Sequence, residues 1–238
     1  MSKSQIKALV FDVFGTVVDW RTSISRQAAE LGTKHGVEAD WNKFADDWRA
    51  GYGVGMAKVN SGEDEWKIVD QIHRERLEVI LDEYGFPSID DAELTEFNKA
   101  WHRLNGWTDS TDGLLRLKSK YIIASLSNGN IALLTNMAKY ANLPWDAVLS
   151  AELTGKYKTH PRAYTKTAEL LGLEYDEVML VAAHNGDLRG AINAGLKAAL
   201  VTRPYEYGDA KQADLEPEPD FHYFAKDFHD LADQLGCT

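Results

Sequence analysis

The chain is poor in cysteine: its 238 residues include one, Cys237, next to the last position. A single cysteine excludes a disulfide framework and is typical of a reducing cytoplasm, which is the compartment we expect. A nucleophilic role for Cys237 is disfavoured, since chain ends tend to fray. Long apolar runs are missing too, because none approaches the roughly 20 residues that cross a bilayer. The stretch from Met1 to Gln5 is polar, so we expect no signal peptide and no membrane partner.

Basic residues are also scarce relative to acidic ones. The chain has 26 Lys and Arg against 37 Asp and Glu, which gives a formal net charge of −11. An acidic surface repels phosphate backbones, so nucleic acid is not an expected partner. Hydrophobic residues are 44% and charged residues 26%, which is ordinary for a globular protein, and the length suits one elaborated domain or a core with a cap.

Short apolar runs that recur along the chain predict the strands of a parallel sheet. The first run, residues 6–11, is partly β-branched and is soon followed by Gly15. Helical patterns alternate with the later runs, which predicts an α/β fold with helices on both faces of a Rossmann-like sheet. The predicted strands are residues 6–11, 121–126, 147–149, 178–182 and 198–201, and the predicted core helices are 131–140, 161–171 and 188–194.

Residues 21–106 differ from the rest because no convincing strand interrupts their helical patterns. We predict an all-helical cap inserted after the first strand, with the segment around Trp107 returning the chain to the core. The expected domains are a discontinuous catalytic core, residues 1–20 and 107–238, and a cap, residues 21–106. The predicted cap helices are residues 21–34, 41–56, 65–84 and 91–104.

Polar residues follow each predicted strand that would end at one edge of the sheet. In an open parallel sheet, ligands bind outside the carboxyl ends of the strands, so these residues are the candidates for chemistry. In strand order they are Asp12, then Ser127 and Asn128, then Lys156 and Lys158, then His184, Asn185 and Asp187.

Asp12 is the first candidate for a nucleophile. A carboxylate directly after a buried strand is costly to desolvate unless it is paired or hydrogen-bonded. A lysine within reach would lower the pKa of this carboxyl and keep it ionised. Lys158 is better placed than Lys156, because Pro161 and its helix follow it closely. Capping a turn is the alternative role for Asp12, and this residue by itself does not decide between the two.

Four motifs then stand in the order and spacing of one enzyme superfamily. They are Phe-Asp-Val-Phe-Gly-Thr-Val at 11–17, Ser-Asn-Gly at 127–129, Tyr-Lys-Thr-His-Pro at 157–161 and His-Asn-Gly-Asp at 184–187. Together they resemble the motifs of the haloacid dehalogenase superfamily, and the resemblance spans residues 6–202. It implies a Rossmann-like core and makes Asp12 the nucleophile.

The phosphatase branch of that superfamily carries a second aspartate two positions after the nucleophile, where this chain has Phe14. An aromatic ring can neither protonate a leaving group nor bind Mg²⁺. Phosphatases also end the fourth motif in adjacent acidic residues, whereas Leu188 follows Asp187 here. Because both departures fall at positions linked to a metal, we expect no metal and no other cofactor.

The sequence instead resembles the type II (L-)2-haloacid dehalogenases, which carry Asp-x-(Tyr/Phe)-Gly-Thr and a Trp-Arg pair in an early helical cap. Trp48 and Arg49 match that pair. The resemblance implies metal-independent hydrolysis of short 2-haloalkanoic acids, such as a haloacetate or L-2-halopropionate, to 2-hydroxy acids through an aspartyl ester on Asp12. It also implies that Arg49 acts at the substrate and captures halide. Spacing alone favours the alternative, an ordinary charge on the surface of a helix.

Further roles follow from the same resemblance. Asp187 would be the general base for the water that cleaves the ester, and Lys158 would neutralise the two carboxylates. Thr16 would hydrogen-bond the nucleophile, and Asn128 would join Arg49 at the leaving halide. The substrate carboxylate would be bound by the backbone N–H groups of Val13 and Phe14, the hydroxyl of Ser127, and Asn128 and Arg49.

Four positions keep more than one interpretation. His184 and Asn185 would help to position the water or Asp187, although a single histidine is more often structural. Trp20 would form a pocket wall and bind substrate, or else pack at a hinge. Gly186 stands where relatives often carry a bulky aromatic residue. The pocket shape, the chain length and stereochemistry of the substrate, and the halogen removed therefore stay open. A homodimer is expected from the resemblance alone.

Two other functions stay open at the level of sequence. Asp12, Ser127, Lys158 and Asp187 are shared with Mg²⁺-dependent small-molecule phosphatases of the same superfamily. A non-catalytic relative that only binds a small carboxylate is the weaker alternative, because every catalytic position holds a competent residue. Release of halide or of phosphate separates these functions.

Overall fold

The computed structural model of the chain describes residues 5–209 and 213–238. The first four residues of the predicted core segment 1–20 lie outside that range. The expectation that the chain has no signal peptide concerned residues 1–5, and of these the structure describes Gln5 alone. Within the described ranges, none of the helices is long and apolar enough to cross a membrane.

Five parallel strands form the central sheet, in the order β4-β1-β5-β6-β7. Strand β1 lies between β4 and β5, where Phe11 is level with Ser125 and Val181. The predicted α/β fold with a parallel sheet is confirmed, and the carboxyl ends of these three strands meet at one edge. The strands are β1 (Ala8–Phe11), β4 (Ile122–Ser125), β5 (Val178–Ala182), β6 (Lys197–Val201) and β7 (Tyr223–Ala225).

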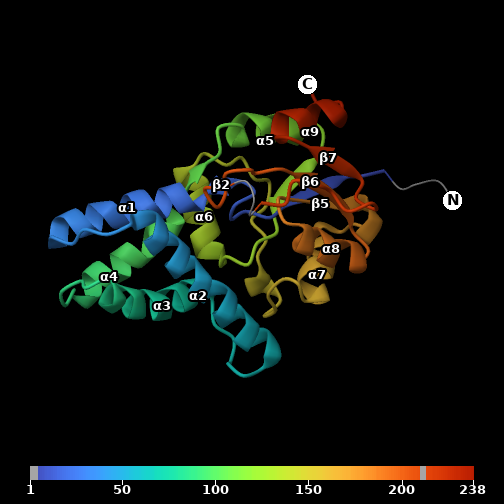
Figure 1. The fold of residues 1–238 in the computed structure, drawn as a ribbon. Helices are drawn as coiled ribbons and strands as arrows, with labels where there is room; N and C mark the ends of the chain where they lie inside the picture. Colours follow the sequence, from blue (N-terminus) through green and yellow to red (C-terminus); the bar gives the residue numbers. More distant parts are fainter. Residues whose placement is uncertain (1–4, 210–212) are drawn as a thin grey trace.

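Helices cover both faces of the sheet, because alternate residues of each strand point to opposite faces. Leu9 and Phe11 belong to one hydrophobic layer, and Ala8 and Val10 to the other. Figure 1 shows α5 and α9 above the sheet and α7 and α8 below it. The helices of this core are α5 (Ser110–Lys118), α6 (Ile131–Tyr140), α7 (Pro161–Leu171), α8 (Asn185–Asn193) and α9 (Phe228–Gln234).

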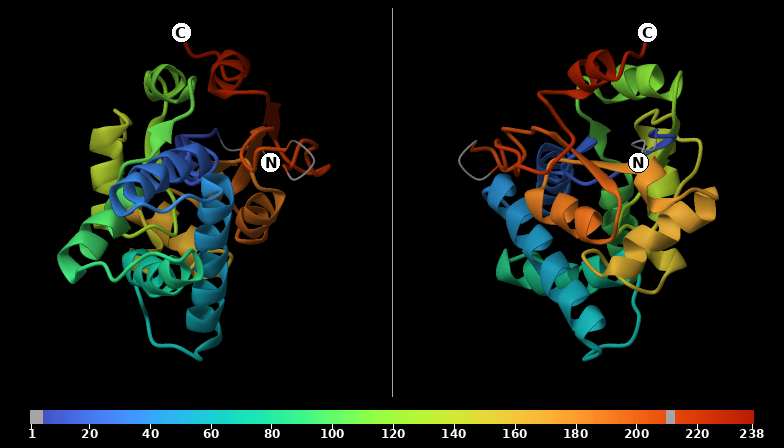
Figure 2. Two further views of the ribbon diagram at one scale, coloured as in Figure 1. Left: turned by 60° about the vertical axis from the view of Figure 1, so that its left-hand side comes forward. Right: turned by 90° about the vertical axis from the view of Figure 1, so that its right-hand side faces the viewer.

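Figure 1 shows the first four helices as a group beside the sheet, and the left view of Figure 2 brings that group forward. Asp40 caps α2 by accepting the N–H groups of Asn42 and Lys43, and Gly36 and Gly62 end α1 and α2 in the left-handed conformation. The predicted helical insertion is confirmed, and we call these helices, with the 3₁₀ turn η1, the helical cap. They are α1 (Trp20–His35), α2 (Trp41–Ser61), α3 (Val69–Glu83), α4 (Asp91–Asn98) and η1 (Lys99–His102).

A short antiparallel ribbon marks the place where the chain leaves the core and returns to it. Its strands are β2 (Val18–Asp19) and β3 (Asn105–Gly106). The indole N–H of Trp107 donates to the carbonyl of Gly15 at 2.8 Å, which fastens the returning segment to the loop after β1. Strand β3 was not foreseen in a segment predicted to be helical throughout.

Several predicted elements need correction. Residues 147–149 are not a strand: Ala147 makes an isolated parallel bridge to Ala124 of β4, and Ser150, just after them, makes one to Ser127. The Ser125 hydroxyl bonds both backbone groups of Leu149, at 2.9 and 3.0 Å, so a side chain replaces the regular ladder there. Strand β7 and helices α5 and α9 were not predicted from the sequence. Helix α2 extends to residue 61, α3 begins at 69, α4 gives way to a 3₁₀ turn after residue 98, and α8 begins at 185.

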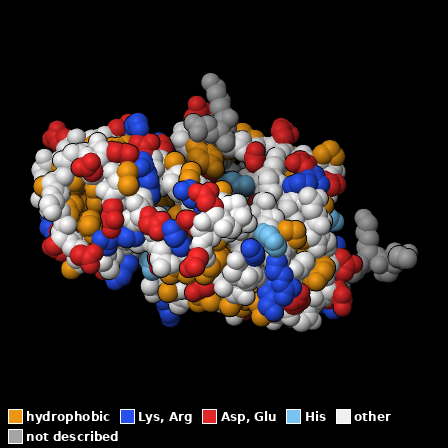
Figure 3. Space-filling view, turned by 90° about the horizontal axis from the view of Figure 1, so that it is seen from below, with side chains coloured by type: hydrophobic (Ala, Val, Ile, Leu, Met, Phe, Trp, Pro, Cys, Tyr) orange, Lys and Arg blue, Asp and Glu red, His pale blue; other side chains and the backbone are white. Residues whose placement is uncertain are grey.

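The surface mixes charges of both signs. Figure 3 shows acidic and basic side chains interspersed over the face that it presents. Some are paired along helices, as Arg74 and Glu78 are at 2.9 Å. The net charge of −11 is therefore not gathered into one acidic patch on the face shown, and that face offers no continuous basic track.

A buried ion pair ties the end of β6 to the start of α5. Arg203 donates to both carboxylate oxygens of Asp109, at 2.8 and 3.0 Å, and its Nε donates to the carbonyl of Thr16 at 2.8 Å. The Phe228 N–H also donates to Asp109, at 2.8 Å. Burial by itself would raise the pKa of Asp109, but Arg203 outweighs it and holds that pKa below its usual value. The pair thus joins the loops after β1 and β6 to α5 and α9.

Replacing this arginine should destabilise the fold. We expect Arg203→Met to lower the free energy of unfolding by about 3–5 kcal/mol, because it leaves the Asp109 charge buried without its partner. Urea unfolding followed by circular dichroism measures this change. The matched control is Arg74→Met, whose partner Asp91 is 86% exposed, and it should cost about 1 kcal/mol or less. An equally small loss of unfolding free energy in both variants would show that the pair of Arg203 and Asp109 does not stabilise the fold.

Candidate active site

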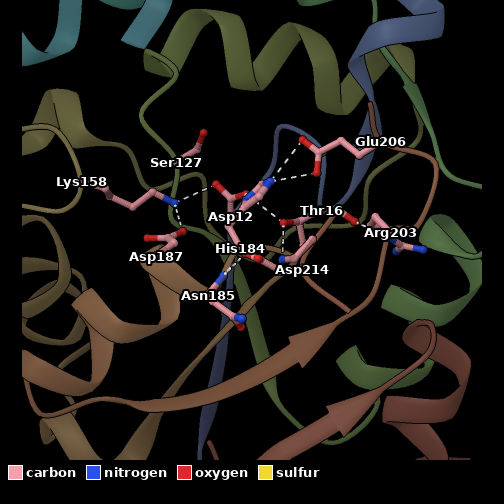
Figure 4. A network of polar contacts seen from close by, with 12 residues as sticks. Asp12, Thr16, Ser127, Lys158, His184, Asn185, Asp187, Arg203, Glu206 and Asp214 are labelled. Atoms are coloured by element: carbon pink, nitrogen blue, oxygen red, sulfur yellow. Dashed lines mark hydrogen bonds and ion pairs between the residues drawn. The ribbon is translucent and has the colours of Figure 1, made fainter. Parts of the chain in front are cut away.

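Asp12 lies at the carboxyl end of β1, buried among three donors (Figure 4). Its Oδ2 accepts the Thr16 hydroxyl at 2.8 Å and faces His184 Nδ1 at 3.2 Å, and its Oδ1 accepts the Lys158 ammonium at 2.8 Å. Thr16 Oγ1 itself accepts the N–H of Ala183 at 2.9 Å, which leaves its proton for Asp12. The structure therefore brings the predicted nucleophile and its predicted partners together.

The Lys158 ammonium stands between two carboxylates. Its Nζ donates to Asp12 Oδ1 at 2.8 Å, to Asp187 Oδ2 at 2.6 Å and to the carbonyl of Leu126 at 2.9 Å, which uses its three N–H groups. The Asn128 side chain fixes the backbone of Lys158 by accepting its N–H at 2.8 Å. Burial alone would lower the pKa of Lys158, but the two carboxylates raise it above its usual value, so the group stays charged.

The pKa values of the two carboxyl groups, Asp12 and Asp187, shift in opposite directions. Burial by itself raises the pKa of Asp12, but Lys158 and His184 outweigh it, and that pKa falls well below its usual value. For Asp187, burial and the nearby Asp12 charge exceed the effect of Lys158, so its pKa rises. Tyr164 donates to Asp187 Oδ1 at 2.7 Å. Asp12 is thus held as an anion, while Asp187 is the more basic of the pair.

His184 contacts Asp12 rather than Asp187. Its Nε2 lies 3.1 and 2.9 Å from the two carboxylate oxygens of Glu206, which is itself buried. Partial burial would lower the pKa of His184, but the bonds to Asp12 and Glu206 raise it to about 10. Trp20 Nε1 donates to Glu206 Oε1 at 3.1 Å, so one carboxylate connects His184 to the first residue of α1.

A cavity of about 200 Å³ opens between the sheet edge and the helical cap. Arg49 reaches it from α2, with its guanidinium carbon 4.0 Å from the ring centre of Tyr52, 5.4 Å from Phe14 and 5.6 Å from Trp20. Arg49 Nη1 is buried without a hydrogen-bond partner. A buried donor without an acceptor fits an anionic group of a ligand. The cavity is lined by Asp12, Phe14, Arg49, Tyr52, Asn128, Lys158, Thr159, His184 and Asp187.

The remaining predicted residues lie around this cavity without lining it. Ser127 is fully buried, and its Oγ accepts the Gly129 N–H at 3.2 Å. Asn185 begins α8, with its N–H donating to Asp214 and its Nδ2 donating to the carbonyl of Glu216, so it is turned away from Asp12. Thr16 supports Asp12, Trp20 lies beside Arg49, and Val13 is buried directly after Asp12. Gly186 is exposed, and a Cβ added there would meet no atom within 4 Å.

Four residues of this site were not predicted from the sequence: Tyr52, Thr159, Tyr164 and Glu206. Tyr52 lies three positions after Arg49 and so shares its helix face, a signal that could have found it. Glu206 follows the end of β6, and reading that strand end in the same way as the others would have found it. Thr159 stands inside the motif at 157–161, directly after Lys158, a signal that could have found it, whereas nothing in the sequence marks Tyr164.

The oxygen ligands expected for Mg²⁺ are not assembled here. Phe14 contributes none, and Asp12 and Asp187 both face the same lysine ammonium. In the part of the chain that the structure describes, no group of three or more His, Cys, Asp or Glu side chains is arranged to hold a metal ion. The residues present therefore do not fit a divalent cation.

Known proteins resemble this chain over nearly its full length. A curated relative, (S)-2-haloacid dehalogenase 4A of Burkholderia cepacia, is 31% identical over 85% of this chain and 87% of its own. Among solved structures, a defluorinating L-2-haloacid dehalogenase is 46% identical (TM-score 0.95; 98% of this chain, 96% of the other). A second L-2-haloacid dehalogenase is 43% identical (TM-score 0.90; 97% and 99%). The profile of the haloacid dehalogenase-like hydrolases matches residues 6–195, and the chain belongs to that family.

Proposed function

We propose that this enzyme hydrolyses the carbon–halogen bond of short 2-haloalkanoic acids through an ester on Asp12, without a metal ion. One observation carries the proposal. An ionised Asp12, fixed by Lys158, shares a small cavity with the unpaired guanidinium N–H of Arg49. The relatives at 43% and 46% identity, both L-2-haloacid dehalogenases, support the same activity.

The first step is a displacement at carbon. A carboxylate oxygen of Asp12 forms a bond to the carbon that carries the halogen, and halide leaves with the electron pair of the broken bond. Asp12 belongs to the sheet edge and Arg49 to the helical cap, so the two charges can act on opposite sides of that carbon. Arg49, with the Asn128 amide, stabilises the charge that develops on the halide. The substrate carboxylate takes the backbone N–H groups near Phe14.

The second step is hydrolysis of the ester. Water attacks the carbonyl carbon of Asp12, and Asp187 accepts a proton from that water. The raised pKa of Asp187 suits this role, since a more basic carboxylate accepts a proton more readily. Lys158 stays charged between the two side chains and prevents their mutual repulsion.

The size of the cavity supports small substrates. About 200 Å³ accommodates a haloacetate or a 2-halopropionate, and the rings of Phe14 and Tyr52 bound the space beyond it. The proposal includes two expectations that rest on the resemblance and on composition. They are a homodimer, which light scattering measures, and a cytoplasmic location, which the single cysteine favours.

Halide release in the presence of EDTA tests the activity. We expect chloride from chloroacetate and 2-chloropropionate, with fluoroacetate as a third substrate that reports on carbon–fluorine cleavage. The variant Asp12→Asn should lose release entirely, because an amide is not a nucleophile here. No halide, together with Mg²⁺-dependent phosphate release from aryl phosphates, would sink the proposal. Silence in both assays with a carboxylate still binding would identify a binding protein.

Arg49 should be needed as a guanidinium and not only as a charge. We expect Arg49→Lys to lower kcat/KM by about 10²–10³-fold, because the planar donor set held among aromatic rings is lost. Steady-state chloride release measures this. Arg74→Lys, at the surface of the same cap, is the matched control and should keep wild-type rates. An Arg49→Lys variant within twofold of wild type would show that Arg49 does not meet the halide.

A further inference from the structure

The two oxygens of Asp12 are bonded unequally. Oδ2 faces two donors, Thr16 at 2.8 Å and His184 at 3.2 Å, whereas Oδ1 accepts Lys158 at 2.8 Å. A carboxylate oxygen has two lone pairs in its plane, so these contacts occupy both lone pairs of Oδ2 and one of Oδ1. Oδ1 therefore keeps a lone pair for attack on carbon, and Oδ2 becomes the carbonyl oxygen of the ester.

The partners of His184 fix its charge. Its Nδ1 faces Asp12 and its Nε2 faces Glu206, and an ionised carboxylate can only accept a hydrogen bond. Both ring nitrogens must then carry protons, which makes the ring an imidazolium. Figure 4 shows the ring directly between the two carboxylates.

Glu206 is held rigidly in this position. It is 2% exposed, its Oε1 accepts the indole N–H of Trp20 at 3.1 Å, and Arg203 anchors the same loop through Asp109. The loop after β1 makes room for it, since a Cβ on Gly15 would lie 2.0 Å from Glu206 Oε1. A carboxylate buried so closely against the backbone has little freedom to turn away from His184.

We propose that Glu206 is a positioning residue that holds His184 as an imidazolium against Asp12 Oδ2, so that His184 and Thr16 stabilise the oxyanion formed when water attacks the ester. The inference rests on the proposed function and extends it to the second step. His184 touches the reacting oxygen, and Glu206 acts through His184.

The change of charge on Asp12 Oδ2 explains why the His184 cation accelerates the second step rather than the first. In the first step Asp12 begins as an anion and passes its charge to the halide, so a cation at Oδ2 favours the starting state. In the second step Oδ2 begins as a neutral carbonyl oxygen and gains a negative charge. A fixed cation then stabilises the transition state more than the ester, which is the condition for acceleration.

The bonds and protons of this step balance. Water oxygen bonds to Cγ of Asp12 while Asp187 takes one of its protons, and the π electrons of the carbonyl move onto Oδ2. The carbonyl then re-forms and the bond between Cγ and Oδ1 breaks. The released alkoxide takes the proton from Asp187 and becomes the 2-hydroxy acid. Asp12 ends with an oxygen from water and loses a proton to solution.

The variant Glu206→Gln tests the inference, because an amide can still bond Trp20 but removes the negative charge beside His184. We mix it with one equivalent of chloroacetate and measure chloride release and, by intact mass, the carboxymethyl ester on the protein. Chloride release in the first turnover should stay close to wild type. Ester hydrolysis should slow on the order of 10- to 100-fold, less than the loss from removing an oxyanion donor outright, so the ester accumulates.

A double-variant cycle separates positioning from a general structural role. If Glu206 acts through His184, adding Glu206→Gln to His184→Gln should slow ester hydrolysis little further. Effects that multiply would show that Glu206 acts independently. Glu218→Gln is the matched control, since Glu218 lies in the same connection between β6 and β7 but pairs with Arg189, and it should leave both steps unchanged.

The pH profile gives a second readout. Asp12 and Glu206 face the ring of His184, Lys158 and Asp187 lie beyond Asp12, and Arg49 lines the same cavity. His184 must be protonated to act, so ester hydrolysis falls as pH rises through its pKa, which is about 10 beside an ionised Asp12. Esterified Asp12 contributes no charge, so the fall should begin below pH 10. Without Glu206 it should begin lower still.

These measurements distinguish a failure of the inference about Glu206 from a failure of the proposed function. Ester accumulation with an earlier alkaline fall supports the inference. A variant that loses both steps equally, or hydrolyses the ester at the wild-type rate and pH, overturns it while leaving the proposed function intact. A wild-type enzyme that releases no halide overturns the proposed function and this inference together.

Discussion

One ammonium group, that of Lys158, makes the arrangement of this site possible. Two buried carboxylates, on Asp12 and Asp187, lie within hydrogen-bonding distance of the same Nζ, at 2.8 and 2.6 Å. Without a cation between them, burial and mutual repulsion would protonate one or both. Lys158 also bonds the carbonyl of Leu126, the residue directly after β4, so the end of that strand fixes the position of the ammonium group. The different basicities of the two carboxylates, and hence their different roles, depend on this contact.

The sheet brings together residues that lie far apart in the sequence. Strands β1, β4 and β5 end side by side, which places Asp12, the loop after Leu126 and Asp187 at one edge. The helical cap contributes Arg49, a cation that faces the cavity among the rings of Phe14, Trp20 and Tyr52. Core and cap are joined by β2, β3 and the contacts of Trp20, so the geometry of the cavity depends on the segments that link them.

Much of this could be predicted from sequence where a local rule applies. The rule that ligands gather at strand ends found Asp12, Lys158 and Asp187, and helical periodicity found the cap. The rule failed for residues 147–149, because the Ser125 side chain takes the hydrogen bonds of a strand. Asn185 was expected in the site, yet its backbone N–H and its Nδ2 donate to the loop after β6. Glu206 comes from that same connection, in which no periodic sequence pattern points to the site.

Gly186 is a position where the chain can tolerate change beside its catalytic groups. It is exposed, one residue before Asp187, and a Cβ added there would meet no atom within 4 Å beyond its own helix turn and chain neighbours. A small side chain at this position would therefore leave the bonds from Lys158 and Tyr164 to Asp187 in place. In evolutionary terms, the identity of residue 186 can drift while its neighbour Asp187 stays under constraint.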